Sequence, residues 1–89
     1  MELSDEKKNK ISEQILALLY SIFPKSLFTA HIAREIARDE EFIKKLLLDL
    51  KKKNLVIELN KNPKGKQYLK RARWRLSDIS YKIYKTKQQ

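Results

Sequence analysis

The strongest constraint on the fold is the segment 50–56, with the sequence Leu-Lys-Lys-Lys-Asn-Leu-Val. It is typical of the last turn of a helix, a left-handed residue and the first residues of a strand, because asparagine tolerates positive φ better than most residues. Further along, residues 73–78 have the pattern of a returning strand that leads into another helix. The second half of the chain is therefore expected to run from helix to hairpin to helix.

The residues around and between these strands predict a β-hairpin over about 55–76. Residues 55–59, Leu-Val-Ile-Glu-Leu, alternate as a half-buried strand does. Residues 60–66, Asn-Lys-Asn-Pro-Lys-Gly-Lys, include the only glycine and have the composition of a turn. The return strand has one apolar face, expected in the core, and one basic face, expected to be an exposed row of guanidinium groups. These faces are Ala72, Trp74 and Leu76 against Arg71, Arg73 and Arg75.

Apolar residues at helical spacing predict four helices, at about 5–23, 30–37, 40–53 and 78–86. Each is preceded by a residue whose side chain can cap it, in order Ser4, Thr29, Asp39 and Ser77. Pro24 ends the first helix, and residues 25–28 are predicted to form a short connector.

Three helices, a hairpin and a short last helix predict one α+β domain over residues 1–89, a winged helix-turn-helix. A chain of 89 residues buries only about 60% of its unfolded surface, so a homodimer through the first and last helices would add stability. Without cysteine, a disulfide or a thiolate metal site is excluded. We expect no cofactor, no signal peptide and no membrane span, which needs about 20 apolar residues, and hence a cytoplasmic protein.

The charge is divided unevenly along the chain. Residues 1–50 contain 8 Lys/Arg and 9 Asp/Glu, a net −1, whereas residues 51–89 contain 13 and 2, a net +11. A positive charge concentrated in one half of the chain attracts a polyanion such as a nucleic acid. The alternative is a lysine-rich surface kept for solubility or heat stability. That composition is typical of hyperthermophile proteins and suggests an archaeal or archaeal-viral source.

The spacing over residues 32–77 resembles MarR- and ArsR-type winged-helix regulators. Those families have Leu-Ala and Leu-Gly in the helix and turn, a Ser cap, three core residues, and Gly-Leu-Val entering the wing. The matching residues here are Ile32-Ala33, Ile36-Ala37, Asp39, Ile43, Leu47, Leu50 and Asn54-Leu55-Val56. Arg75-Leu76-Ser77 is similar to the Arg-Leu-Thr that closes the wing. The resemblance implies a homodimeric transcriptional regulator that binds double-stranded DNA.

Two features depart from those families. Arg38 stands where they place an apolar residue, and the third helix begins with the carboxylates of Asp39, Glu40 and Glu41. In the resembled families this end approaches the major groove, where carboxylates near phosphates weaken binding. Acidic residues also stabilise a helix start, and a glutamate can accept a hydrogen bond from cytosine N4.

The candidate nucleic-acid-binding residues are one hydroxyl at the start of the second helix and the basic residues of the third helix and the hairpin. They are Thr29, Lys44, Lys45, Lys52, Lys61, Lys64, Lys66, Lys70, Arg71, Arg73 and Arg75. The hairpin group is interpreted as phosphate contacts, because a wing projects beyond the body and lysine acts as a point charge. Glu58 is expected to pair across the hairpin with one arginine. A solvated basic face is the alternative for both groups.

The apolar and aromatic candidates have less specific roles. Leu48 lies opposite the core stripe of the third helix, and three roles stay open for it: it completes the core, it contacts a protein partner, or it contacts a thymine methyl group. Trp74 is expected in the core, and Tyr81 and Tyr84 are expected to pack on the first helix. His31 is the only histidine, and no second histidine or cysteine accompanies it, so we expect no metal site and no enzyme chemistry.

Three binding functions stay open at this point. The leading one is double-stranded DNA binding, sequence-dependent or general, by a small transcriptional regulator. RNA binding, for example by a ribosome-associated winged helix, suits the basic half equally well. A protein-interaction module in a transcription complex is favoured by the acidic start of the third helix and by Leu48.

Overall fold

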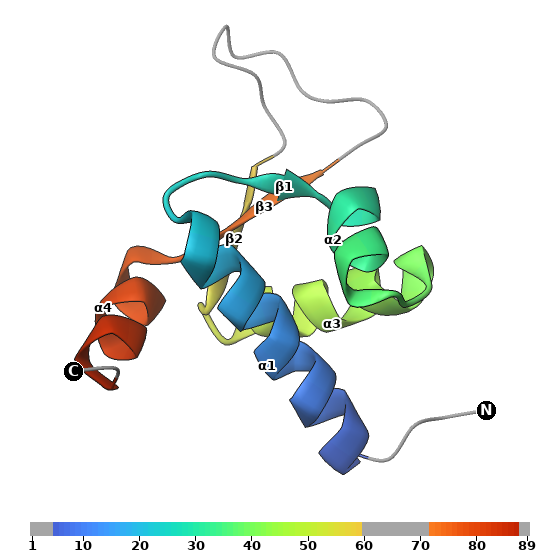
Figure 1. The fold of residues 1–89 in the computed structure, drawn as a ribbon, viewed down its shortest axis with the longest axis horizontal. Coiled ribbons are helices and arrows are strands. Elements are labelled where there is room, and N and C mark those ends of the chain that lie inside the picture. The colour runs from blue at the N-terminus through green and yellow to red at the C-terminus, as the bar shows by residue number, and fades with distance from the viewer. Residues whose placement is uncertain (1–4, 60–71, 88–89) are drawn as a thin grey trace, which may run out of the picture.

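The computed structural model of the chain describes residues 5–59 and 72–87. Its elements are, in order, α1 (Asp5–Ile22), β1 (Leu27–Phe28), α2 (Thr29–Ile36), α3 (Glu40–Lys52), β2 (Val56–Leu59), β3 (Arg73–Leu76) and α4 (Asp78–Lys87). Helices α1 to α3 form a body beside the strands, and α2 and α4 lie at opposite ends of the molecule (Figure 1). This arrangement confirms the predicted α+β winged-helix class. None of the described helices is long and apolar enough to cross a membrane.

One apolar core joins the first three helices to the sheet. Its side chains come from the predicted helical stripes and from the inward-facing positions of β2 and β3. The largest of them that are fully buried are Trp74, Ile15, Leu19, Ile32, Ile43, Leu47 and Leu76. The prediction that Trp74 belongs to the core is therefore confirmed.

The sheet has three antiparallel strands in the order β1-β3-β2, so β3 is central. Leu27 and Glu58 both lie opposite Trp74, from the two sides of β3. The prediction of a plain connector over residues 25–28 is wrong, because two of these residues pair with β3. A strand of two residues is too short to show an alternating pattern, which explains why the sequence did not indicate it.

The first residue of α2 holds the centre of the sheet instead of capping its helix. The Trp74 indole Nε1–H donates to the Thr29 hydroxyl oxygen at 2.7 Å, and both side chains are buried. The residue before α2 is Phe28, whose side chain makes no capping hydrogen bond. The predicted N-cap role of Thr29 is therefore wrong. A fully buried indole needs an acceptor, and the hydroxyl supplies it.

Three of the other predicted helix ends are confirmed by local geometry, and the predicted cap Ser4 lies outside the described residues. Asp39 accepts a hydrogen bond from the Phe42 backbone N–H at 3.2 Å, which caps α3. After α3, Asn54 has a φ of 62°, the left-handed stop that the sequence predicts. Ser77 accepts from the Ser80 backbone N–H at 3.1 Å at the start of α4. These short-range signals fix where the helices begin and end.

Helix α4 is held to the end of α1 by aromatic rings. The Phe23 and Tyr81 rings stack at 4.0 Å between centroids, and Tyr20 lies 5.3 Å from Tyr81 and 5.6 Å from Tyr84. Burial raises the pKa of Tyr84, and the Glu13 carboxylate raises it further. The predicted packing of Tyr81 and Tyr84 on the first helix is confirmed.

Replacing Thr29 with valine keeps the shape of the side chain and removes the acceptor for Trp74. We expect the free energy of unfolding, measured by urea denaturation, to fall by about 1–3 kcal/mol, since a buried donor is left without a partner. Thr86→Val is the matched control, because the Thr86 hydroxyl makes an exposed hydrogen bond, to the Lys82 carbonyl of the same helix α4. Equal losses in the two variants would show that the Trp74 contact has no special weight.

Candidate nucleic-acid interface

The outward-facing side of α3 is defined by the core stripe on its inner side. That buried stripe consists of Ile43, Leu46, Leu47 and Leu50. Beyond the first turn, the exposed residues of α3 are Lys44, Lys45, Leu48, Asp49, Lys51 and Lys52, and we call Lys44, Lys45, Leu48 and Lys52 the α3 outer face. The structure therefore brings the three predicted lysines of α3 together on one exposed side of the helix.

These three lysines are solvated rather than paired. Within the described part of the chain, neither an ion pair nor a hydrogen bond involves the side chain of Lys44, Lys45 or Lys52. By contrast, the neighbouring Lys51 Nζ lies 2.8 Å from a Glu58 carboxylate oxygen. The α3 outer face thus keeps its positive charge for an external anion.

The pairing of Glu58 with Lys51 corrects the prediction that Glu58 pairs with a hairpin arginine. In an antiparallel pair, residues directly opposite each other project to the same side of the sheet. Glu58 lies opposite Trp74, so both side chains project toward the helices. Glu58 therefore meets α3, while the arginines of β3 lie on the other side.

The predicted row of freely exposed arginines on β3 is wrong for the two members that the structure describes. The Arg75 guanidinium donates to the Leu76 carbonyl at 2.9 Å and to the Asp78 carboxylate at 3.3 Å. Its side chain is only 23% exposed, whereas that of Asp78 is 72% exposed. Arg75 is thus committed to the start of α4 and is a weaker candidate for phosphate binding.

Arg73 is covered by the strand that the sequence did not indicate. Phe28 of β1 lies opposite Arg73, and the guanidinium carbon lies 4.6 Å from the centre of the Phe28 ring. This is a cation–π distance, so the side chain lies against the protein's own surface. Without knowledge of β1, the alternation of β3 alone could only predict exposure.

The remaining predicted residues fall into two groups. Thr29 is buried against Trp74, so its hydroxyl faces inward and we leave it out of the interface proposed below. The other hairpin residues lie outside the described residues: Lys61, Lys64, Lys66, Lys70 and Arg71.

Two further features of α3 bear on what it can bind. Glu40 and Glu41 are exposed in its first turn, so the start of the helix is acidic, whereas the rest of it carries four exposed lysines and one exposed carboxylate, Asp49. Leu48 is 37% exposed, so it does not complete the core.

His31 lies on the exposed side of α2 with Nε2 3.6 Å from a Glu35 carboxylate oxygen. Among the residues that the structure describes, no three His, Cys, Asp or Glu side chains are grouped to hold a metal ion.

No family model matches the chain, and no curated protein matches it in sequence. Several solved structures match its fold. The Zalpha domain of Carassius auratus PKZ, solved with Z-DNA, gives a TM-score of 0.62 at 21% identity, over 79% of this chain and 97% of that one. The S. aureus MepR–DNA complex gives 0.74 at 19% identity, over 93% and 65%. The zinc-responsive MarR family member ZitR of Lactococcus lactis gives 0.66 at 18% identity, over 96% and 51%.

These similarities establish the fold as that of a winged helix-turn-helix domain. The chain spans nearly all of the Zalpha domain but only about half to two thirds of the ZitR and MepR chains. The match therefore concerns the winged-helix unit itself.

The cap and the charge of Asp39 can be separated by two substitutions. Asp39→Ala removes the hydrogen bond to Phe42, and we expect the free energy of unfolding to fall by about 1 kcal/mol. Asparagine caps a helix about as well as aspartate, so the free energy of unfolding of Asp39→Asn is expected to lie within about 0.5 kcal/mol of that of the parent. Urea denaturation of both variants tests this expectation. A loss in Asp39→Asn as large as in Asp39→Ala would mean that charge, and not capping, stabilises α3.

Proposed function

We propose that this chain binds double-stranded DNA with the α3 outer face, as a small transcriptional regulator and not as an enzyme. The observation that supports this most is the set of three exposed, solvated lysines on α3 of a winged-helix fold. The known structures with this fold include two that were solved with DNA. The net charge of +11 over residues 51–89 supplies the attraction for a phosphate backbone.

The dimensions of α3 suit this role. Lys44 and Lys52 are eight residues apart, about 12 Å along a helix, with Leu48 midway on the same side. A major groove about 12 Å wide admits a helix, and lysines on its flanks reach phosphates or guanine edges. Because Glu40 and Glu41 are exposed at the start of α3, we expect the middle and the end of the helix to approach the duplex most closely.

The hairpin is part of the proposed interface, but its arginines are expected to contribute less to DNA binding than the sequence alone predicts. Arg73 and Arg75 are engaged by Phe28 and Asp78, so we expect each of them to contribute less than a lysine of α3. The hairpin residues that lie outside the described ranges remain predicted phosphate contacts.

The proposal predicts a strong and localised salt dependence. With about six phosphates contacted, log K should fall with log salt at a slope near −5. Replacing all three of Lys44, Lys45 and Lys52 by glutamine should flatten that slope by up to about three units. Each phosphate contact that is lost means that fewer counterions are released when the protein binds. Fluorescence anisotropy with a labelled duplex at several salt concentrations measures it.

The matched control removes the same charge from another exposed surface. Lys82, Lys85 and Lys87 are exposed on α4, and their replacement with glutamine, in a variant that light scattering shows to keep the oligomeric state of the parent, should leave the slope within about one unit of the parent. If both triple variants flatten the slope equally, binding is a general effect of net charge and the α3 outer face is not the interface.

We also propose that the regulator acts as a homodimer through α1 and α4. On the side of α4 away from the aromatic contact with α1, Ile79 is 66% exposed and Ile83 is 47% exposed, an arrangement that a second copy would cover. Two copies could place their α3 helices about 34 Å apart along one face of a duplex.

Size-exclusion chromatography with light scattering tests the dimer. The parent chain should elute as a dimer at high concentration, and the double variant Ile79→Lys, Ile83→Lys should be a monomer because two charges would be buried. Ala30→Lys, at an exposed position of α2 outside the proposed interface, should stay dimeric. A strictly monomeric parent would contradict the dimer and leave the DNA proposal standing.

A second candidate function is contact with a protein partner in a transcription complex. It is favoured by Leu48, which is 37% exposed on the same helix as exposed Glu40 and Glu41. Competition at matched salt separates the alternatives. Preference for duplex DNA supports the main proposal, preference for structured RNA would move the function to RNA, and no binding of either at low salt would favour the protein partner.

A further inference from the structure

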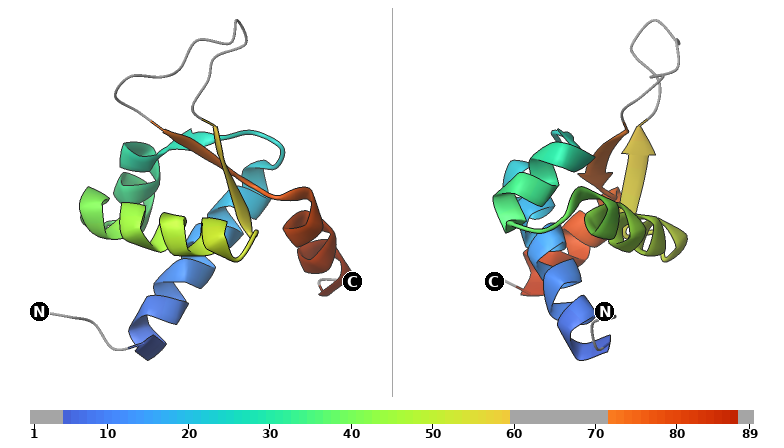
Figure 2. Two further views of the ribbon diagram at one scale, coloured as in Figure 1. Left: turned by 180° about the vertical axis from the view of Figure 1, so that it is seen from behind. Right: turned by 90° about the vertical axis from the view of Figure 1, so that its right-hand side faces the viewer.

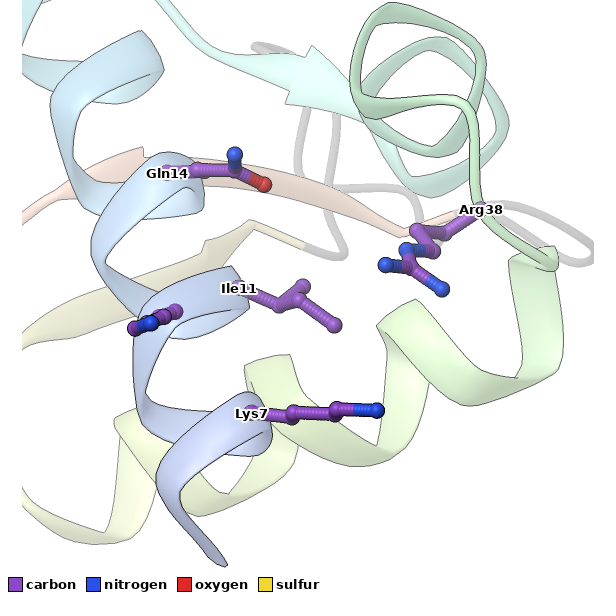
Figure 3. Close-up of a pocket in the computed structure, with 5 residues that line it drawn as sticks. Lys7, Ile11, Gln14 and Arg38 are labelled. Atoms are coloured by element: carbon purple, nitrogen blue, oxygen red, sulfur yellow. The ribbon is translucent and has the colours of Figure 1, made fainter. Parts of the chain in front are cut away.

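A cavity lies between α1 and the turn that joins α2 to α3. Its volume is about 340 Å³, and it is lined by Lys7, Lys10, Ile11, Gln14 and Arg38. Figure 3 shows Lys7, Ile11 and Gln14 projecting from α1 into the space that Arg38 enters from the turn. Three of the five lining residues are cationic and none is acidic, so the cavity is suited to an anion.

The residues are held in place by two rigid elements. Lys7, Ile11 and Gln14 are spaced four and three residues apart, which puts them on one face of α1. Arg38 follows Ala37, which has a φ of 61°, and its backbone N–H donates to the Ala33 carbonyl at 3.0 Å. The guanidinium is thus carried on a turn whose backbone is fixed opposite that face.

The chemistry of the lining favours a phosphate group. Ile11, 4% exposed, forms an apolar base, and the Gln14 amide adds a donor. Within the described residues, no hydrogen bond or ion pair involves the Arg38 side chain. A guanidinium binds two phosphate oxygens in parallel, and such charge-assisted hydrogen bonds are the stronger ones. The Lys10 Nζ lies 4.0 Å from a carboxylate oxygen of exposed Glu6. An exposed ion pair of this kind is weak, so a bound anion can replace it.

We propose that this cavity is a phosphate-binding site separate from the α3 outer face. Helix α1 lies in front of α3 in Figure 1, and α3 lies in front of α1 in the reversed view of Figure 2. A duplex on the outer face of α3 would therefore not supply the phosphate from the same stretch of DNA. The phosphate comes either from a free phosphate-bearing small molecule or from the backbone of a second duplex.

The first arm of the test uses free anions. Pyrophosphate and adenosine monophosphate are titrated into the ¹⁵N-labelled chain at about 0.15 M salt, where distant charges are screened. We expect chemical-shift changes centred on Lys7, Ile11, Gln14 and Arg38, and about tenfold weaker binding in Arg38→Gln. Arg34→Gln removes the same charge from an exposed α2 residue outside the cavity and should bind as the parent does.

The second arm identifies the source of the phosphate. Beads that carry one duplex are incubated with the protein and then with a second, fluorescent duplex. Capture by the parent and by Arg34→Gln, but not by Arg38→Gln, identifies the backbone of a second duplex. No capture, together with localised shifts in the first arm, identifies a free small molecule. The proposal is overturned by equal losses in Arg34→Gln and Arg38→Gln, or by shifts spread over the whole basic surface without Arg38-dependent capture. The first arm needs no duplex, so it stands even where the proposed DNA binding fails.

Discussion

The hydrogen bond between Trp74 and Thr29 connects the two halves of the fold. Trp74 lies on the central strand β3 and is fully buried, and Thr29 is the first residue of α2. The bond therefore fixes where the helix-turn-helix begins relative to the sheet. It also places Phe28, the residue before Thr29, beside β3, where the short strand β1 completes the sheet. The direction in which α3 presents its lysines depends on this connection.

The same arrangement decides which positive charges are available. With Trp74 facing the helices, the alternate residues Arg73 and Arg75 lie on the other side of β3, where Phe28 and Asp78 engage them. The lysines of α3 have no such partners among the described residues, apart from Lys51. A basic sequence thus becomes a surface in which some cations hold the fold and others remain for a ligand. In the proposed function, binding depends mainly on the second group.

The parts of the structure that sequence predicted are those that local signals determine. The cap at Asp39 and the left-handed Asn54 each depend on a few neighbouring residues, and the exposure of the α3 lysines follows from the helical period. The parts that it missed depend on partners distant in the chain. Glu58 pairs with Lys51 because of the sheet register, and the strand at Phe28 exists only through its pairing with β3. For the candidate site, position on the helix was predictable, but competition from the protein's own side chains was not.

Lysine footprinting would test the central claim most directly, because it reports each amine separately. The chain is acetylated with and without a saturating duplex at about 0.1 M salt, and the modification of each lysine is measured by mass spectrometry. The account predicts that the duplex protects Lys44, Lys45 and Lys52, while Lys82 and Lys85 on α4 stay as reactive as in the free chain. Unchanged reactivity of the three α3 lysines while the duplex is demonstrably bound would contradict it.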